Sequence, residues 1–329
     1  MSLSRMSSKR TIHDVEDSDH EEGGSRVESQ RSKKSKTEIS AEYTGPTNKV
    51  LPENIVIPVK PAGRTRIACW NVSGLVACEK KGFKQYVRAE NPDILIITET
   101  KMNQPSIDPA LKELFPHQFW SISAKKGYSG TTIFSKSEPL SIKETLSGHP
   151  DPQEVKGRIV TLEFSSCYIV GTYVVNAGQK LQTLNNKKVW NTHFFAYLNE
   201  LDKTKPVVWA GDFNVAPSAL DLANAKKNWN KTAGYTEAEV TAYNTFLNPP
   251  EDSEDHKFID IWRDLHPGKR DYSYFSYRFN CRTKGLGWRI DGFVISERLK
   301  ERVKMCEIRS EIYGASDHIP MALELEGAL

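Results

Sequence analysis

From about Arg64 to its end the chain alternates short apolar runs with turn residues, and this pattern most narrows what it can fold into. The runs are RIACWN, DILIIT, HQFWSIS, GTTIFS, RIVTLEF, CYIVGTYVV, KPVVWAGD, WRIDGFVIS and PMALELE. Because they are rich in Val, Ile and aromatic residues, they predict β-strands. Helices are predicted at 81–90, 188–201 and 236–247, the last with Thr236 and Glu239 at capping-box spacing. The mixture predicts one large α/β domain of packed sheets covered by helices.

The first 60 residues differ from the rest because they contain almost no aromatic or clustered aliphatic side chains. Such a segment buries too little apolar surface to offset the entropy of ordering it, so we expect a disordered tail at 1–60 before a domain at 61–329. An acidic run precedes a basic cluster formed by Arg31, Lys33, Lys34 and Lys36. This cluster is either a nuclear localisation signal or part of a solvated chain of mixed charge.

Composition excludes several classes of protein. No run approaches the ~18 apolar residues that cross a bilayer, and the start lacks the apolar core of a secretory signal. The five cysteines show no C-x-x-C pair, which argues against a disulfide framework or a structural zinc site. Lys and Arg number 45 against 42 Asp and Glu, giving a net charge of +3. We therefore expect a cytosolic or nuclear protein with reduced thiols.

Polar side chains gather where the predicted strands end. They are Asn71, Glu99, Tyr173, Asn176, Asp212, Asn214, Asp291, Asp317 and His318. Singly, each has an ordinary structural explanation: Asp and Asn form turns after strands, and a histidine is often part of a core. Together, acids, amides, a tyrosine and a histidine placed by one rule suit a hard divalent cation and a phosphate ester.

The order and context of these residues closely resemble the apurinic/apyrimidinic (AP) endonucleases of the exonuclease III type, within the endonuclease/exonuclease/phosphatase superfamily. The matching blocks are CWNVSGL (69–75), PDILIITETK (92–101), KKGYSGTTIFSK (125–136), GTYVVNAG (171–178), WAGDFNVAP (209–217), YSYFSYRFN (272–280), GLGWRIDGFVIS (285–296) and GASDHIP (314–320). The resemblance implies a four-layer α/β sandwich, with two mixed β-sheets packed face to face and helices outside. It also implies metal-dependent cleavage of DNA on the 5′ side of an abasic site.

The resemblance assigns roles residue by residue. It implies a catalytic set of Tyr173, Asp212, Asn214, Asp291 and His318, with Asp212 as candidate base and Asp291 as the partner of His318. It implies a metal-binding set of Asn71, Glu99, Asp212, Asn214, Asp317 and His318. The expected ion is Mg²⁺, with Mn²⁺ as a substitute, because Mg²⁺ binds through few carboxylates and keeps contact with phosphate.

Further matches concern the DNA. Lys125, Lys126, Tyr128, Asn176, Gln179 and Arg278 match positions that contact or enter the duplex, although a solvated basic loop would look the same in sequence. Tyr274, Trp288 and Ile290 match an apolar pocket for the flipped abasic sugar, and ordinary aromatic core is the competing explanation.

Some positions depart from the family pattern. Ser73 stands where animal enzymes have an acid near the metal, and we expect altered or weaker ion binding there. Val175 replaces a proline. Trp229 and Thr232 replace asparagines that contact phosphate or line the pocket. Ala68 occupies the position of a cysteine credited with redox activity in mammalian members, so a redox role is not expected.

These observations favour a nuclear, monomeric base-excision-repair enzyme that cleaves 5′ to abasic sites in double-stranded DNA and leaves 3′-hydroxyl and 5′-deoxyribose-phosphate ends. Minor 3′-phosphodiesterase and 3′-5′ exonuclease activities follow from the resemblance. Contacts of the charged N-terminal tail with repair proteins or import receptors stay open. A mitochondrial pool stays open. The alternatives are a phosphatase or RNA nuclease with the same metal centre, and a catalytically inactive nucleic-acid-binding module.

Overall fold

Two six-stranded sheets form the centre of the computed structural model, which describes residues 46, 51–106 and 108–329. The first sheet has the order β11-β12-β1-β2-β4-β3 and the second β5-β6-β7-β8-β10-β9. The first contains β1 (Arg64–Asn71), β2 (Ile94–Thr98), β3 (His117–Ser121), β4 (Thr131–Ser135), β11 (Val303–Ile308) and β12 (Met321–Glu326). The second contains β5 (Ser141–Lys143), β6 (Ile159–Glu163), β7 (Tyr168–Tyr173), β8 (Val207–Asp212), β9 (Phe258–Asp260) and β10 (Asp291–Ser296).

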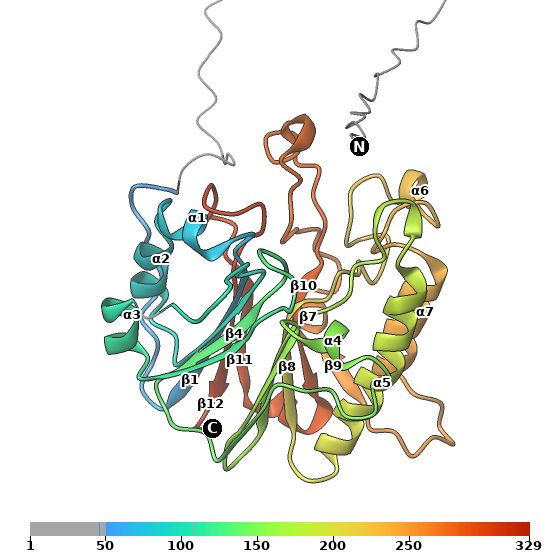
Figure 1. Ribbon diagram of the computed structural model, residues 1–329, viewed down its shortest axis with the longest axis horizontal. Helices are drawn as coiled ribbons and strands as arrows, with labels where there is room; N and C mark the ends of the chain where they lie inside the picture. Colours follow the sequence, from blue (N-terminus) through green and yellow to red (C-terminus); the bar gives the residue numbers. More distant parts are fainter. Residues whose placement is uncertain (1–45, 47–50, 107) are drawn as a thin grey trace, which may run out of the picture. The chain divides into compact units, whose positions relative to one another are not determined.

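Both sheets are mixed, and each has one parallel pair. β1 runs parallel to β2 and β7 runs parallel to β8, whereas the other neighbouring strands are antiparallel. Their facing sides share one apolar core, to which Ile96, Val208 and Phe293 belong. The sheets therefore pack face to face, as Figure 1 shows.

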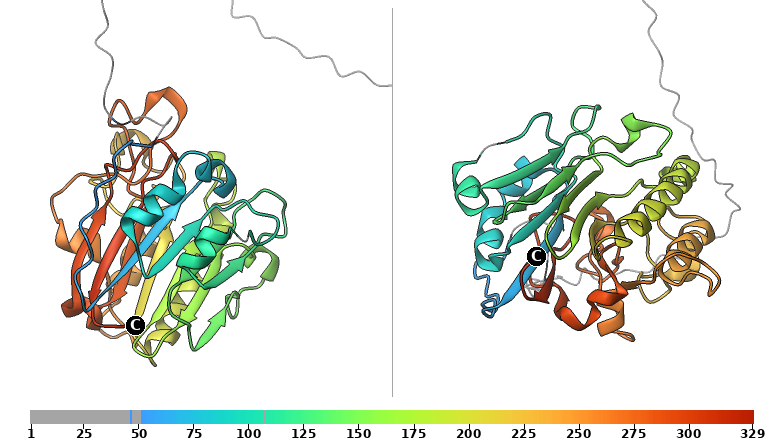
Figure 2. Two further views of the ribbon diagram at one scale, coloured as in Figure 1. Left: turned by 90° about the vertical axis from the view of Figure 1, so that its left-hand side faces the viewer. Right: turned by 90° about the horizontal axis from the view of Figure 1, so that it is seen from below.

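Helices cover the two outer faces (Figures 1 and 2). α1 (Leu75–Glu79), α2 (Phe83–Glu90) and α3 (Pro109–Leu114) contribute to a core with β1, β2 and β4. α4 (Pro152–Val155), α5 (Leu184–Asp202) and α7 (Glu237–Leu247) contribute to a core with β6, β7 and β8. Two further short helices, α6 (Ala225–Asn228) and α8 (Ile261–Leu265), and 3₁₀ turns at Gln179–Leu181, Arg278–Asn280 and Glu297–Arg302 complete the described elements. The result is the four-layer α/β sandwich that the sequence predicts.

The predicted elements agree with the observed ones. Each of the nine apolar runs contains a strand, and the helices at 81–90, 188–201 and 236–247 appear as α2, α5 and α7. The capping box is present, because Thr236 accepts from the backbone of Glu239 while the Glu239 side chain accepts from the backbone of Thr236. No described helix is long and apolar enough to cross a bilayer.

Sequence analysis missed β5, β9 and β11. β5 and β9 are only three residues long, and all of β5 is exposed. β11 reads VKMCEI, where charged residues interrupt the apolar pattern. These strands exist because neighbouring strands offer backbone partners, which their own sequences do not signal.

The N-terminal boundary is the other difference. The acidic run and the basic cluster at Arg31, Lys33, Lys34 and Lys36 lie outside the described residues. Residues 51–60, assigned by sequence to the tail, form no helix or strand, but Leu51 and Ile57 are buried in the core beneath α2. The packed chain therefore includes residues on the tail side of the predicted boundary.

Candidate active site

A cavity of about 880 Å³ lies at one end of the two sheets. It is lined by the end of β8 and by residues that follow or precede β1, β2, β7, β10 and β12. Side chains from both sheets line it, among them Glu99 after β2, Asp212 at the end of β8 and His318 before β12. Rigid strand ends hold these groups in place with little loss of entropy on binding. The predicted strand-end residues Tyr173, Asn176, Asn214 and Asp317 line the same cavity.

Asn71 joins the two central carboxylates. Its side-chain amide donates to Glu99 Oε1 at 3.0 Å and to Asp212 Oδ2 at 2.9 Å. Potential ligand atoms of Glu99, Asp212 and His318 all lie within 4.8 Å of one another. Asn71 itself is buried at the end of β1 and does not line the cavity, so it contacts both acids from the protein interior.

The two carboxylates differ in acidity. Burial, then the negative charge of Asp291, raises the pKa of Asp212 to about 7, although His318 opposes the shift. Burial also acts to raise the pKa of Glu99, but Lys101, Asn71 and His318 outweigh it and hold that pKa below its usual value. Lys101 Nζ lies 2.9 Å from Glu99 Oε2. Glu99 is therefore ionised at neutral pH, while Asp212 titrates near it.

His318 is held by Asp291. His318 Nδ1 lies 2.7 Å from Asp291 Oδ2, which also accepts a hydrogen bond of 2.7 Å from Ser273 Oγ. Burial alone would lower the pKa of His318, but Asp291, Asp212 and Asp317 raise it to about 10. At neutral pH the imidazole is therefore protonated, and its remaining N–H is a charged donor.

A second network fixes the backbone after β8. Asn214 N donates to Asp212 Oδ1 at 2.8 Å, and Asn214 Nδ2 donates to Val174 O at 2.9 Å. The Asn214 carbonyl accepts from Lys187, a buried lysine of α5 that also lies 2.9 Å from Glu239 of α7. Asn176 Nδ2 donates to Asn214 Oδ1 at 2.7 Å. These contacts anchor the backbone that follows β8 to α5 and α7.

Tyr173 packs against Arg158, which lies between two tyrosine rings. Its guanidinium is 5.3 Å from the Tyr173 ring centre and 5.5 Å from that of Tyr128, whose hydroxyl accepts from Arg158 at 2.9 Å. Burial, then the charges of Glu99 and Asp212, raise the pKa of Tyr173, so its hydroxyl is neutral and can donate.

The backbone near the cavity takes unusual conformations. Six non-glycine residues that line it, Ser73, Glu99, Lys101, Lys180, Asn214 and Phe279, have φ between 49° and 60°. Gly211 precedes Asp212 at φ 134°, and a Cβ there would lie 2.1 Å from the Thr172 carbonyl oxygen. This close approach of β7 to β8 requires the glycine of the WAGD run.

The predicted apolar pocket residues also meet at the cavity. Tyr274, Trp288 and Ile290 line it, and the Tyr274 ring lies 4.8 Å from the His318 ring. Single bridges join Tyr274 to both Trp288 and His318. An apolar wall therefore stands directly beside the charged groups.

The predicted DNA contacts divide into two groups. Asn176, Gln179 and Arg278 line the cavity. Lys125 and Tyr128 line a neighbouring hollow of about 360 Å³, and Lys126 is exposed and lines neither. Sequence reasoning gave no site role to Lys101, Arg158, Lys187 or Ser273. Lys101 and Ser273 carried a signal, because both lie in blocks that match the family pattern, PDILIITETK and YSYFSYRFN.

Two of the departures from the family pattern line the cavity. Ser73 and Thr232 line it, and the Ser73 amide donates to Asn71 Oδ1 at 2.9 Å. Trp229 is 38% exposed and packs on Tyr235, whereas Val175 is buried. Cys69 is buried too, and burial raises the pKa of its thiol, which disfavours the reactive thiolate.

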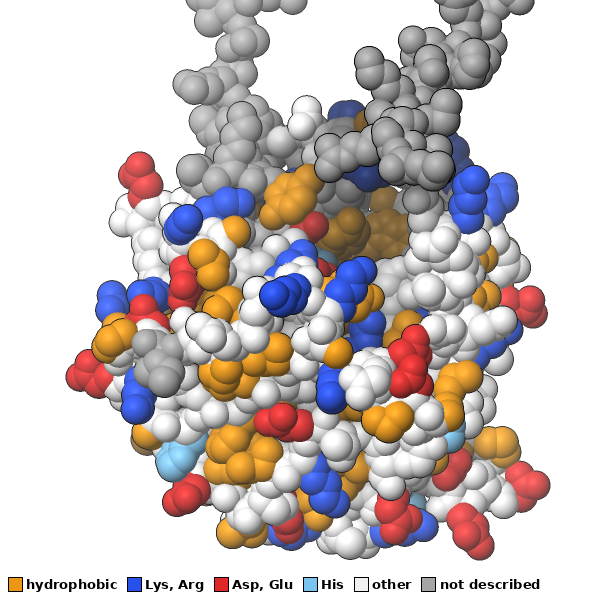
Figure 3. Space-filling model, in the orientation of Figure 1, with side chains coloured by type: hydrophobic (Ala, Val, Ile, Leu, Met, Phe, Trp, Pro, Cys, Tyr) orange, Lys and Arg blue, Asp and Glu red, His pale blue; other side chains and the backbone are white. Residues whose placement is uncertain are grey.

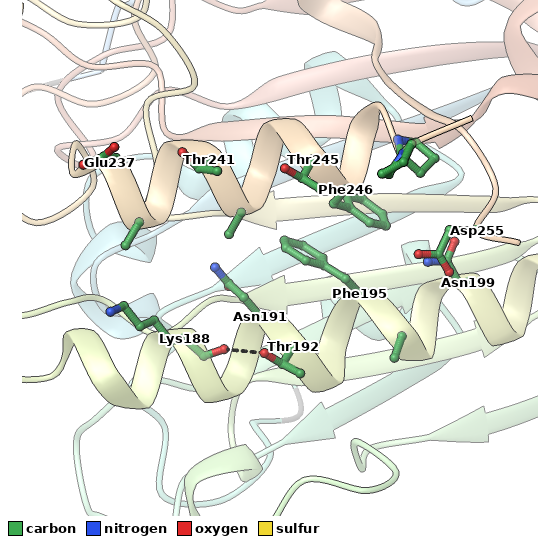
Figure 4. A pocket seen from close by; sticks show the side chains of 15 residues that line it. Lys188, Asn191, Thr192, Phe195, Asn199, Glu237, Thr241, Thr245, Phe246 and Asp255 are labelled. Carbon is green, nitrogen blue, oxygen red and sulfur yellow. Dashed lines mark hydrogen bonds between the residues drawn. The ribbon is translucent and has the colours of Figure 1, made fainter. Parts of the chain in front are cut away.

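A separate groove of about 760 Å³ lies between α5 and α7 (Figure 4). Phe195 and Phe246 stack at its floor with ring centres 4.3 Å apart. Its charged residues, Lys188, Glu237 and Asp255, form no cluster that could hold a metal ion among the described residues. The groove is therefore a poor candidate for hydrolytic chemistry.

Comparison with known proteins agrees with this geometry. The model of the Endonuclease/Exonuclease/phosphatase family matches residues 68–318. A DNA-(apurinic or apyrimidinic site) endonuclease of Dictyostelium discoideum is 37% identical over 280 residues, covering 83% of this chain and 74% of the relative. An exodeoxyribonuclease of Bacillus subtilis is 37% identical over 260 residues, covering 78% of this chain and 98% of its own length. The crystal structure of an AP endonuclease from Leishmania major superposes with a TM-score of 0.69 at 27% identity, covering 82% of this chain and 90% of that one.

Proposed function

The chain belongs to the endonuclease/exonuclease/phosphatase family, and from that premise we propose that it is a metal-dependent DNA endonuclease that hydrolyses the phosphodiester 5′ to an abasic site. The products are a 3′-hydroxyl and a 5′-deoxyribose phosphate. The observation that carries the proposal is one cavity in which carboxylates, a protonated histidine and an apolar wall lie side by side. The relatives named for abasic-site and exonuclease activity support it.

The donor set fits a hard divalent cation such as Mg²⁺, for which Mn²⁺ would substitute. Glu99 is ionised, a carboxylate oxygen of Asp212 lies close to it, and carboxylate oxygens are ligands that such ions prefer. Glu99 and Asp317 would hold the ion, with Asp212 and Asn214 close by, while the Asn71 NH2 group orients the carboxylates of Glu99 and Asp212. When bound, the ion supplies positive charge to the phosphate oxygens and the leaving group. Protonated His318 has no lone pair to offer, so we assign it to the phosphate instead.

Asp212 is the proposed base. Its pKa of about 7 matches the value at which a carboxylate both accepts and releases a proton readily at neutral pH. Asn214 places its backbone N–H on the other carboxylate oxygen and so fixes the orientation of the group. Asp212 accepts the proton of the attacking water, and protonated His318, oriented by Asp291, donates to a phosphate oxygen. Tyr173 and Asn176 also donate to the phosphate.

The apolar wall decides which nucleotide enters. Tyr274, Trp288 and Ile290 would receive a flipped sugar that lacks its base. Lys125, Lys126, Tyr128, Gln179 and Arg278 are exposed or line hollows, and we assign them to the DNA backbone and grooves. Minor 3′-phosphodiesterase and 3′-5′ exonuclease activities use the same groups on 3′ termini.

The test is single-turnover cleavage of a duplex that contains one tetrahydrofuran abasic analogue. We expect Mg²⁺-dependent incision 5′ to the analogue that EDTA abolishes and that His318→Ala slows about 100-fold or more. RNA and phosphoinositide substrates run alongside. Preferred cleavage of either, or incision that His318→Ala leaves at the wild-type rate, contradicts the proposal.

We also infer a monomer that works in the nucleus. The eukaryotic relative named as an abasic-site endonuclease and the basic cluster of residues 31–36 support the nuclear assignment. Replacing Arg31, Lys33, Lys34 and Lys36 with alanine in a fluorescent fusion should move it to the cytoplasm. Sedimentation at micromolar concentration checks the monomer.

A further inference from the structure

The exposed aromatic rings are unevenly distributed. Among the described residues, the large aromatic side chains classed as exposed are Tyr128, Trp229, Tyr277 and Phe279, at 41%, 38%, 46% and 81%. All four lie on segments that border the catalytic cavity or the hollow beside it. Burying an aromatic ring is strongly favourable, so rings left in water around one site indicate a ligand that covers them.

Phe279 stands on the loop between Tyr274 and Trp288, which Figure 1 shows projecting from the domain. Its backbone has φ 60°, an uncommon value for a phenylalanine, and its side chain lines the cavity. The loop is closed by Leu286 N donating to Cys281 O at 2.9 Å, and Arg282 donates to the carbonyls of Ser316 and Asp317 beside the catalytic residues. The ring is thus presented to solvent by a braced loop.

Trp229 stands on a second segment of the rim, directly after α6. Its ring meets Tyr235 edge-on at 4.9 Å, and Tyr235 meets Trp288 of the apolar wall at 6.5 Å. Aromatic rings therefore run from the surface to the cavity. The neighbours Asn228, Lys231 and Thr232 line the cavity as well.

Basic residues flank both rings. Arg278 precedes Phe279, and Lys226, Lys227 and Lys231 surround Trp229 in the sequence. Figure 3 shows Lys and Arg side chains gathered near the upper centre of the molecule. Aromatic rings interleaved with positive charges bind single-stranded nucleic acid, because bases stack on the rings while the cations follow the phosphates. A protein partner would not require these charges.

We propose that Phe279 and Trp229 are stacking platforms for unpaired DNA bases. In a duplex each base face is covered by its neighbours, so only unpaired bases offer a free face. The inference rests on the proposed function and extends its substrate class: the cavity takes DNA with unpaired bases beside the scissile phosphate, such as a mismatched 3′ terminus or a single strand. The aromatic pocket then serves the abasic sugar, and the two rim rings serve nucleotides that keep their bases.

The test measures binding in EDTA, where hydrolysis does not occur. Fluorescence anisotropy gives the Kd of the full-length protein for a single-stranded oligonucleotide and for a fully paired duplex of the same sequence. Phe279→Leu and Trp229→Leu keep an apolar side chain but remove the ring. Since a stacked base contributes about 1–3 kcal/mol, each variant should weaken single-strand binding about 5- to 150-fold. The ratio of single-strand to duplex affinity should fall in the same direction.

Leu265→Ala is the matched control, because Leu265 is an exposed apolar side chain, at 44%, that does not line the cavity. It should leave both affinities at wild-type values. A 2-aminopurine base at the mismatched 3′ terminus supplies a second readout, since stacking on a ring quenches its fluorescence. Loss of quenching in both ring variants supports the proposal.

Equal affinities of wild type and ring variants for the single strand overturn the inference, as does an equal loss for strand and duplex. Incision of the abasic duplex by wild-type protein with Mg²⁺ is measured in parallel. If that incision occurs while the ring variants bind normally, only this inference fails. If wild type does not incise, the proposed function fails, whatever the rings do.

Discussion

Two clusters of charged side chains, one beside the second sheet and one between the strand ends of both sheets, are balanced differently. In the first, Arg289 just before β10 contacts Asp221 at 2.7 Å and Asp260 at 2.9 Å, while Arg263 also pairs with Asp221. In the candidate active site, the four acids Glu99, Asp212, Asp291 and Asp317 are accompanied by three cations among the described residues: His318, Lys101 and Arg282. The first cluster has as many cations as acids, and the second has an excess of acids.

The pKa values follow this balance. Burial would raise the pKa of Asp221, but Arg289 outweighs it and holds that pKa below the usual value. Burial raises the pKa of Asp212 to about 7, and the acid Asp291 adds to the shift. Asp221 is therefore held ionised by its cations, whereas Asp212 takes up a proton near neutral pH, because burial and its acidic neighbours outweigh His318. The excess of acid is what makes the second cluster a candidate for catalysis.

The largest expected effect comes from removing the central acid. Asp212→Asn keeps the shape but cannot accept a proton, so incision of the abasic duplex should slow about 100- to 10,000-fold. Binding of the duplex should change little. Single-turnover kinetics and anisotropy separate the two, and near-normal cleavage would mean that another group is the base.

Asp212→Asn should slow incision but should make the folded protein more stable than wild type at higher pH. Because the folded-state pKa of Asp212 is raised, its contribution to stability is present at low pH and is lost as pH rises through about 7. Without divalent ions, wild type should lose thermal stability relative to Asp212→Asn between pH 4 and 8. A difference in Tm between wild type and Asp212→Asn that stays constant across this pH range would contradict the raised pKa of Asp212.

Breaking the balanced cluster should instead unfold the protein. Arg289→Met leaves Asp221 and Asp260 buried without their main cation, which should lower the free energy of unfolding by about 3–5 kcal/mol. Urea denaturation measures it. Lys257→Met, at a half-exposed pair with Glu297, is the control and should cost under about 1 kcal/mol. An equal loss of unfolding free energy in both variants would show that burial does not make the Arg289 ion pairs more important for stability.

A smaller effect is expected at Lys187, whose buried ion pair with Glu239 lies next to the candidate active site. Lys187→Met leaves Glu239 buried without its cation and removes the donor to Asn214, which should cost about 1–3 kcal/mol of stability and slow incision about 10-fold. Adding Glu239→Gln should restore stability but not the rate, because Asn214 still lacks its donor. Recovery of the rate in the double variant would assign Lys187 a purely structural role.

The smallest effect is expected when the excess of acids in the cavity is increased by one. Ser73→Asp adds an acid beside Asn71 at φ 49°, a conformation that aspartate tolerates well. One more negative charge should lower the Mg²⁺ concentration for half-maximal incision about 3- to 10-fold. Ser73→Asn tests shape without charge and should match wild type, and an equal gain in both variants would rule out an electrostatic cause.

Sequence could predict many of the residues that line the candidate active-site cavity, because they lie at the ends of strands whose apolar runs are unmistakable. Glu99, Asp212 and His318 each come directly after or before such a run, and rigid strands bring their ends together. Order along the chain therefore sufficed for these residues. The residue pattern also located α2, α5 and α7 and predicted packed sheets covered by helices, and the family resemblance supplied the number of sheets.

Other residues could not be found this way, because their role depends on contacts across the fold. Lys187 is one of two adjacent lysines on α5, and nothing in that pair says which is buried against Asn214. Arg158 contacts Tyr128 and Tyr173, which are distant in sequence, because the fold brings their segments together. Strand β11 depends on its partner β12 in the same way. Pairing and burial are decided by tertiary structure, which local pattern does not encode.

The left-handed backbone of the six cavity residues has a consequence for engineering and for evolution. Each such residue costs on the order of 1–3 kcal/mol compared with a relaxed conformation. A screen for heat resistance alone would therefore favour glycine at Glu99 or Lys101, and would discard the carboxylate or ammonium group that the site uses. Heat-resistant forms that keep their activity should accumulate changes on the outer helices, where the backbone holds no such strain to release.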